Sequence, residues 1–370
     1  MLDTGPPRRP TRRRWVTTAG ALVLAVVAAV LAARSTTGRS ADPAPAPARR
    51  PVLVSVAVGP AAVYALAARC DGTVPACDYQ LHRRAAGADR WDPVPWRIGP
   101  LAGAGPAPTV TVSGAGAVTV VTAIDPPQVL RSTDDGRTVV SRPLRPGPPV
   151  AALPADGVLR IEPCDGCADR LTVVEPATGL ARPLATQPPL GRYVLRSVDR
   201  AGDVVWAVAV DRRSTAGAVS TDGGRSWRAV PVPGPSSPNQ QLRVLAGADG
   251  SAWLVAGPYT GGPAQQFTGV RRIDGPAGRW RQVDRSGPQT VRSVLAGRRG
   301  LLLVETNGAV WRLPPGGRFA RLPEAAPYRP GDLVAGPGPI LASISPDDAT
   351  GRIVLLSDDE GGTWRAEQVV

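Results

Sequence analysis

The residues of this chain with the most distinctive spacing for chemistry are its four cysteines. Cys164 and Cys167 flank two residues, as zinc ligands and redox-active dithiols do, and Cys70 and Cys77 close a second short segment. A Cys₄ zinc site would require two distant loops to converge, and no strand–helix unit surrounds the Cys-x-x-Cys. We therefore predict two local disulfides, Cys70–Cys77 and Cys164–Cys167, with a zinc site and a redox dithiol as alternatives.

Other groups that could catalyse a reaction are few. A Ser/His/Asp hydrolase would have to use His82, the only histidine, which lies beside Arg83 and Arg84 in a predicted strand. A solvated strand residue is the simpler interpretation of that position. No phosphate-binding loop or dinucleotide fingerprint follows a strand and opens a helix. We predict no catalytic residue, no bound cofactor and no metal ion.

Three stretches share the pattern Ser-x-Asp-x-Gly-x-(Ser/Thr)-(Trp/Val), at 132–139, 220–227 and 357–364. Ser and Asp two residues apart can bond nearby backbone N–H groups and so stabilise a tight turn, and the Gly suits a left-handed backbone. An apolar run precedes each stretch, and strand-like alternation follows it, so strand, turn, strand is the local prediction. The residues assigned a structural role here are Ser132, Asp134, Gly136, Ser220, Asp222, Gly224, Trp227, Ser357, Asp359, Gly361 and Trp364.

Weaker copies of this unit recur along the chain. The residues that would open the strand after the turn are Trp91, Val139, Leu180, Trp227, Trp280, Phe319 and Trp364. They are spaced by about 45 residues, which is what four strands and their turns require, and radial stacking of such units makes a β-propeller. Seven units fill residues 51–370, with six or eight as alternatives if a faint unit is misassigned. Because the chain ends on an outer strand, we expect no strand exchange to seal the ring.

Composition supports an all-β fold. The chain contains 42 Gly and 42 Pro among 370 residues, which leaves little room for long helices and favours many short strands. The net charge of +13 could suggest nucleic acid, but nine of the 43 arginines lie in residues 1–50 and the rest are interspersed with acidic residues. There is no lysine, so a biased genome explains the charge better than phosphate binding does. We predict no nucleic-acid partner and a monomer.

The first 50 residues predict export. An Arg-rich segment, 1–14, precedes an uncharged apolar segment, 15–33, which is long enough to span a bilayer. The arginines favour a cytoplasmic N-terminus, and the Pro/Ala-rich segment 34–50 would be an extended linker to the domain 51–370. We predict a single-pass signal anchor at the cell membrane with the propeller outside the cytoplasm. The alternative is a signal peptide that is cleaved, so that the protein is secreted.

The three stretches and the 45-residue period resemble the Asp-box, or BNR, repeats of sialidase-like, sortilin-like and photosystem-II-assembly-factor-like β-propellers. The resemblance implies a seven-bladed propeller of four-stranded antiparallel blades, with the boxes on turns away from the ligand face. It places ligand contacts on the loops between second and third strands and between blades. Those loops are 70–78, 124–128, 163–169, 211–217, 259–266 and 345–351.

The chemistry of sialidases is not evident in the sequence. A sialidase needs three arginines, a Tyr nucleophile with a Glu partner and an acid–base Asp, and the family carries a (Phe/Tyr)-Arg-Ile-Pro motif. The nearest string, Arg272-Ile273-Asp274, lacks the aromatic residue and the proline. The tyrosines are Tyr64, Tyr79, Tyr193, Tyr259 and Tyr328. A pair of carboxylates, as in most glycosidases, stays an alternative because acidic residues occur in many loops.

These observations favour a membrane-anchored extracytoplasmic propeller that binds or scaffolds a protein or a cell-envelope glycan without catalysis. A sialidase-like glycoside hydrolase is one alternative. An assembly factor for an envelope complex is another.

Overall fold

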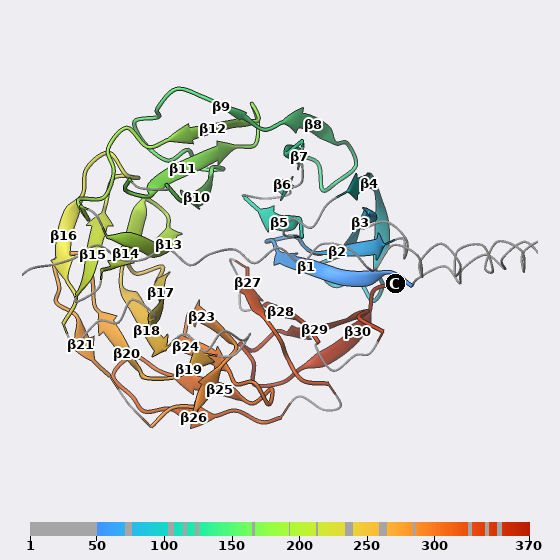
Figure 1. The fold of residues 1–370 in the computed structure, drawn as a ribbon. Helices are drawn as coiled ribbons and strands as arrows, with labels where there is room; N and C mark the ends of the chain where they lie inside the picture. The colour runs from blue at the N-terminus through green and yellow to red at the C-terminus, as the bar shows by residue number, and fades with distance from the viewer. Residues whose placement is uncertain are drawn as a thin grey trace, which may run out of the picture. The chain divides into compact units, whose positions relative to one another are not determined.

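Short antiparallel strands fill most of the compact unit Arg49–Val370 in the computed structural model. The structure describes residues 50–370 except 71–75, 103–106, 114–116, 123–125, 165–166, 192, 212–213, 234–239, 259–264, 284–285, 325–327, 337–339 and 346–349. Seven four-stranded sheets follow one another around a ring, from blue to red in Figure 1. The predicted all-β, seven-bladed propeller is therefore confirmed.

The blades are numbered here in chain order. Blades 1 and 2 contain β1 (Val52–Val58), β2 (Ala62–Cys70), β3 (Ala76–Ala85), β4 (Asp92–Ala102), β5 (Thr109–Val112), β6 (Val118–Val121), β7 (Gln128–Ser132) and β8 (Val140–Pro143). Blades 3 and 4 contain β9 (Arg145–Pro146), β10 (Val158–Glu162), β11 (Arg170–Glu175), β12 (Leu180–Pro183), β13 (Val194–Ala201), β14 (Val204–Val210), β15 (Thr215–Ser220) and β16 (Arg228–Pro231). Blade 5 contains β17 (Gln240–Ala246), β18 (Ala252–Pro258), β20 (Gly269–Ile273) and β21 (Arg281–Gln282). Blades 6 and 7 contain β23 (Ser293–Gly297), β24 (Gly300–Val304), β25 (Val310–Leu313), β26 (Ala320–Arg321), β27 (Leu333–Ala335), β28 (Leu341–Ile344), β29 (Ile353–Ser357) and β30 (Arg365–Gln368). A two-stranded sheet joins β19 (Gln265–Gln266) to β22 (Thr290–Val291).

Six of the seven predicted post-turn residues immediately precede a fourth strand. Trp91 precedes β4, for example, and Trp364 precedes β30. The 45-residue period therefore located the outer strands of blades 1, 2, 4, 5, 6 and 7 from sequence alone.

Blade 3 departs from the prediction. Leu180 begins the third strand, β12, and the turn before it joins the second and third strands. The fourth strand is β9, which lies upstream of the blade and pairs in parallel with β12, Leu180 opposite Arg145. The connection 163–169, predicted to be one of the loops between second and third strands or between blades, joins the first strand β10 to the second strand β11. The period could not show this because the outer strand comes from the segment that links blade 2 to blade 3.

The innermost strand of blade 3 also runs opposite to that of blade 4. Between blades 4 and 5 the innermost strands are parallel, since Ser197 bonds the N–H of Val244 and Asp199 bonds that of Ala246. Between blades 3 and 4, the guanidinium of Arg200, near the end of β13, bonds the carbonyl of Pro154, which precedes β10. At the start of β13, the N–H of Leu195 donates to the carboxylate of Asp169, which follows β10. β10 and β13 are therefore antiparallel.

Serine hydroxyls on innermost strands link neighbouring blades. Ser55, Ser197 and Ser293 each accept an N–H from the next innermost strand, at 3.0–3.1 Å. A Ser-Val pair occurs at all three positions and is a sequence signal for these links that the box motif does not reveal.

Hydrophobic clusters fill the spaces between successive blades. Blade 7 meets blade 1 through Leu53, Val56 and Val63 on one side and Val354 and Leu356 on the other. Among the described strands none is exchanged between these two blades, so side-chain packing closes the ring.

The predicted anchor segment, 15–33, and its flanks 1–14 and 34–49 lie outside the described residues. Among the residues that the structure does describe, no helix is long and apolar enough to cross a membrane.

Candidate functional site

Both predicted disulfides are present. Cys70 is bonded to Cys77 and Cys164 to Cys167, and no free cysteine occurs in the described part of the chain. The first bond joins directly opposed residues at the ends of β2 and β3. The second lies beside Asp169, whose carboxylate accepts the N–H groups of Cys164 and Leu195. These bonds replace the zinc alternative, because a metal ligand must be a thiolate and both sulfurs of each pair are bonded to each other.

The three Ser-x-Asp-x-Gly turns have the same hydrogen bonds. In the blade 4 turn, Ser220 donates to Asp222 at 2.7 Å and accepts the N–H of Gly224 at 2.7 Å. Asp222 in turn accepts the backbone N–H and the hydroxyl of Ser226. The turns of Ser132 and Ser357 repeat these bonds, and the glycine lies at a φ near 90° in all three. The hydroxyl and carboxylate groups of these side chains are occupied by hydrogen bonds within the turn.

Hydrogen bonds keep the aspartates of these turns ionised. The N–H of Thr138, with the hydroxyls of Ser132 and Thr138, lowers the pKa of Asp134 to about 2. The hydroxyl and N–H of Ser226 lower the pKa of Asp222 to about 2. Such groups cannot act as general acids near neutral pH.

Two of these turns also carry an acidic residue with a left-handed backbone, which sequence reasoning missed. Asp135 has a φ of 60° and accepts hydrogen bonds from Tyr64 and Arg83 of blade 1. Glu360 has a φ of 59°, and its carboxylate accepts the N–H groups of Arg298 and Arg299 of blade 6 at 3.1 Å each. A non-glycine residue in this conformation is strained by about 1 kcal/mol. The bonds to the preceding blade give a physical reason for tolerating that strain.

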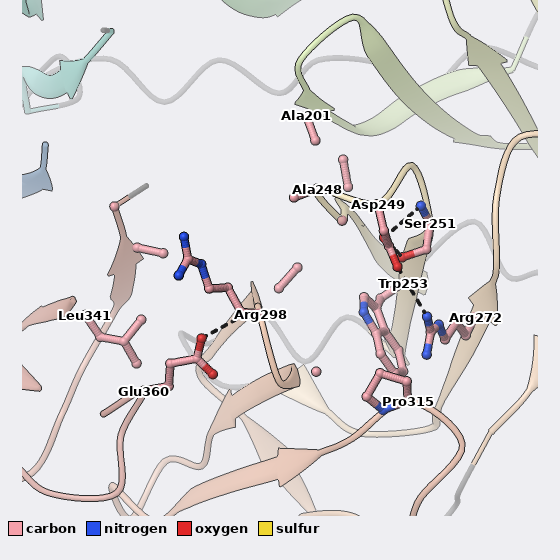
Figure 2. A pocket seen from close by; sticks show the side chains of 17 residues that line it. Ala201, Ala248, Asp249, Ser251, Trp253, Arg272, Arg298, Pro315, Leu341 and Glu360 are labelled. Atoms are coloured by element: carbon pink, nitrogen blue, oxygen red, sulfur yellow. Dashed lines mark hydrogen bonds and ion pairs between the residues drawn. The ribbon is translucent and has the colours of Figure 1, made fainter. Parts of the chain in front are cut away.

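A pocket of about 380 Å³ lies among the turns between first and second strands of blades 4 to 7, together with Glu360 (Figure 2). We call it the turn pocket. Nine of its seventeen lining residues are Ala or Gly. First-to-second and third-to-fourth turns lie at the same end of a four-stranded antiparallel blade, so in these blades the pocket opens at the end that carries the Ser-x-Asp-x-Gly turns.

One wall of the turn pocket is an ion-pair cluster on blade 5. The guanidinium of Arg272 lies 4.9 Å from the ring centre of Trp253 and pairs with Asp249 at 3.7 Å (Figure 2). It also pairs with Asp274 at 3.0 Å. Asp249 accepts both the N–H and the hydroxyl of Ser251. The Ser251 hydroxyl is the main reason that the pKa of Asp249 lies below its usual value.

Glu360 lies across the pocket from this cluster (Figure 2). It is 4% exposed, and its two carboxylate oxygens are occupied by the N–H groups of Arg298 and Arg299. Arg312 donates to its backbone carbonyl. Both carboxylates that line the pocket therefore already accept hydrogen bonds from neighbouring residues. The rest of the lining consists mostly of small side chains, and the two carboxylates do not form an acid–base pair.

The residues considered for hydrolysis are not brought together. Tyr64 is buried between blades 1 and 2 and donates to Asp135, and burial raises its pKa to about 12, so it stays protonated. Tyr193 bonds Ser214, which precedes β15 of the same blade, and Tyr259 lies outside the described residues. His82 occupies a strand, β3, as predicted, but it is half-buried rather than solvated, and burial lowers its pKa. Among the described residues, no cluster of three or more His, Cys, Asp or Glu could hold a metal ion.

The loops predicted to contact a ligand are only partly described. Each of the six contains residues that the structure leaves out, for example 71–75 and 259–264. The turn pocket lies at the other end of its blades from the second-to-third-strand loops, so the sequence prediction did not point to it.

Comparison with solved structures places the chain among β-propellers. The β-propeller domain of the Trilobed protease from Pyrococcus furiosus, described as having an open velcro topology, aligns with a TM-score of 0.54 and 8% identity over 87% of this chain and 96% of that one. Sqt1 from Chaetomium thermophilum aligns with a TM-score of 0.50 and 13% identity over 85% of this chain and 84% of that one. These likenesses show the fold alone.

A more distant match is YCF48 bound to D1 peptide, with a TM-score of 0.36 and 15% identity over 68% of this chain. The matched part spans 65% of that YCF48 chain. No protein-family profile matches the chain, and no curated protein does.

Proposed function

We propose that this chain is a non-catalytic propeller, anchored at the membrane and exposed outside the cytoplasm, that binds a protein ligand in the turn pocket. The observation that carries the proposal is the state of the pocket's carboxylates. Asp249 and Glu360 already accept hydrogen bonds from Ser251 and from Arg298 and Arg299. A hydrolase would need at least one carboxyl group free to exchange a proton with substrate.

The lining of the turn pocket favours an extended peptide segment. Alanine and glycine let a ligand backbone approach closely, and the pocket is lined by four successive blades, from Ala201 to Leu341. The formal charges of Arg272 and Arg298 balance those of Asp249 and Glu360, so no net charge selects a strongly acidic or basic ligand. A preference for an extended peptide segment also supports the scaffold or assembly role considered from the sequence.

Site-specific photocrosslinking in native membranes tests this proposal. A photoreactive residue replacing the exposed Ala248 should crosslink to one segment of one partner protein, identified by peptide mass spectrometry. The same residue at Ala86, exposed on a blade 1 turn outside the pocket, is the matched control. Equal crosslinking from both positions, or none from Ala248, would contradict a protein ligand in the turn pocket.

Catalysis is tested separately. The purified full chain should not turn over fluorogenic sialosides or other aryl glycosides, and robust turnover that is lost in Asp249→Asn would show a glycosidase instead.

The anchor is the remaining part of the proposal. Its support is the apolar segment 15–33 after an arginine cluster, which favours an uncleaved span with its N-terminus in the cytoplasm. N-terminal sequencing of the mature protein should find residues before 15. A mature N-terminus beyond about residue 35 would show a cleaved signal peptide and a secreted protein.

A further inference from the structure

A second pocket, of about 460 Å³, lies where blade 1 meets blade 7. We call it the seam pocket. Its polar lining comes from β2 and β3 of blade 1, namely Arg69, Asp78, Gln80 and His82, and Ala67 and Val370 complete its apolar part. It lies toward the end of the blade that carries the Cys70–Cys77 disulfide, which is the end opposite the first-to-second-strand turns.

The pocket results from a row of polar residues on one face of β3. β2 and β3 pair without a register shift, so Asp78, Gln80, His82 and Arg84 alternate onto the same face. Arg84 pairs with Glu367 of blade 7 at 2.7 Å, which shows that this face is turned toward blade 7.

The row is unusual among the blade interfaces. The third strand of blade 6 turns Trp311 and Leu313 toward the preceding blade, and the third strand of blade 2 turns Leu130. Blade 1 has four polar residues at the equivalent places, and among the described residues only Arg84 of these four pairs with blade 7. Asp78, Gln80 and His82 are left to line the pocket.

The outer strands of blade 1 are longer than those of blade 7. β3 has 10 residues and β4 has 11, whereas β29 and β30 of blade 7 have 5 and 4. The β2–β3 arm is therefore longer than the described strands of blade 7 beside it. The disulfide at its tip fixes the arm, so that the pocket has a preorganised wall.

The polar side chains of the seam pocket have unused hydrogen-bonding capacity. Among the described residues, none hydrogen-bonds the side chains of Arg69, Asp78 or His82. The Gln80 amide nitrogen donates to the carbonyls of Leu81 and Val94, which orients the amide and leaves its oxygen as an acceptor. Arg69 and Asp78 are exposed at the mouth of the pocket, whereas His82 is half-buried and loses hydrogen bonds to water unless a ligand supplies replacements.

The charges point to a neutral ligand. Arg69 and Asp78 are opposite each other across β2 and β3, so their charges balance at the mouth of the pocket. Burial lowers the pKa of His82, so its imidazole is neutral at pH 7 and both donates and accepts. Residues two apart on a strand are separated by about 6.6 Å, which lets successive side chains bond successive hydroxyl groups of one ligand.

We propose that the seam pocket, through Asp78, Gln80 and His82, binds a neutral, hydroxyl-rich ligand, a saccharide of one or two units. This site is separate from the turn pocket, and it requires no acidic sugar and no hydrolysis. Its occupant would contact blade 1 beside blade 7 and so bind at the closure of the ring.

Saturation-transfer NMR on the full chain tests the proposal with four probes: maltose, cellobiose, lactose and 3′-sialyllactose. At least one neutral disaccharide should bind with a dissociation constant of about 1 mM, a typical strength for a few uncharged hydrogen bonds. Asp78→Ala and His82→Ala should each weaken that binding about tenfold, the effect of losing one good hydrogen bond. Asp92→Ala, at an exposed position on β4 outside the pocket, should bind as the wild type does.

Three results would overturn the proposal. They are no binding by any neutral probe at saturating concentration, stronger binding of 3′-sialyllactose than of lactose, and undiminished binding by Asp78→Ala. Because Asp78 is exposed at the end of its strand, Asp78→Ala should keep the wild-type thermal midpoint even if His82→Ala does not. Failure of this test leaves the crosslinking at Ala248 unaffected, so the two sites are judged independently.

Discussion

The interface between blades 7 and 1 is packed very differently from the interface between blades 2 and 3. Ten buried hydrophobic residues fill the first interface, and Glu367 binds both Trp91 and Arg84 across it. The second contains three buried hydrophobic residues, Val121, Val129 and Val174. Among the described residues, the closure of the ring is therefore more densely packed than the interface between blades 2 and 3, although no strand is exchanged there.

The thin interface coincides with the irregular blade. Blade 3 takes its outer strand from Arg145–Pro146, and its innermost strand is antiparallel to that of blade 4. The interface of the same reversed blade with blade 4 is nevertheless filled by ten buried hydrophobic residues, so strand direction alone does not determine where the packing is dense.

The largest effect is expected from the ion pair at the closure. Glu367→Gln leaves the guanidinium of Arg84, with 11% of its side chain exposed, without its charge partner and should lower the free energy of unfolding by about 3 kcal/mol. Urea unfolding of the full chain measures the change. Glu324→Gln removes the exposed partner of Arg321 and should cost no more than about 0.5 kcal/mol. Equal effects of the two variants would show that the closure does not depend on this pair.

A smaller loss of stability is expected from a matched pair of valine substitutions, one in each interface. Val354 and Val129 occupy the same position of the third strand, three residues before the Ser of the turn motif, and each is fully buried against the next blade. Val354→Ala should cost about 2 kcal/mol and Val129→Ala about 1 kcal/mol, because the sparse neighbours of Val129 lose fewer contacts and can close the cavity.

Hydrogen exchange provides a second measurement for this pair. Val129→Ala should raise exchange mainly in β7 to β12, and in the wild type those strands should already exchange faster than β1 and β27 to β30. Faster exchange at the closure than in blades 2 and 3 would reverse the comparison.

The smallest expected effect is the loss of stability of the blade 2 turn at acidic pH. Asp134 in the blade 2 turn has a pKa of about 2, below its usual 3.8, so the carboxylate stabilises the fold above about pH 4 and this contribution is lost as the pH falls toward 2. Pepsin cleavage between pH 4.5 and 2.5, mapped by mass spectrometry, should begin in blades 2 and 3. In blade 7, burial alone would raise the pKa of Asp359, but the N–H of Thr363 and the Ser357 hydroxyl keep it low. That turn should be cut later because its interface is better packed, and Asp134→Asn should remove the pH dependence in blade 2.

The sequence by itself determined the features that local chemistry repeats. Ser, Asp and Gly at fixed spacing form the same turn wherever they occur, so Ser132, Ser220 and Ser357 identified the turns and their spacing identified seven blades. Cysteines close in sequence identified the two disulfides, since short loops bring the thiols together at little cost in entropy.

Only the tertiary structure decided what depends on neighbours. The sequence of Arg145–Pro146 has no strand pattern, and this segment forms a strand because it lies beside the edge of β12 and pairs with it. The turn pocket arises from four blades whose turns adjoin, and Glu360, which lines it, is held by Arg298 and Arg299, 62 and 61 residues away in the chain. The polar row of Asp78, Gln80 and His82 has the alternation of any exposed strand, and its meaning comes from its position beside the shorter strands of blade 7. These outcomes depend on which surfaces meet, and a local pattern carries no information about that.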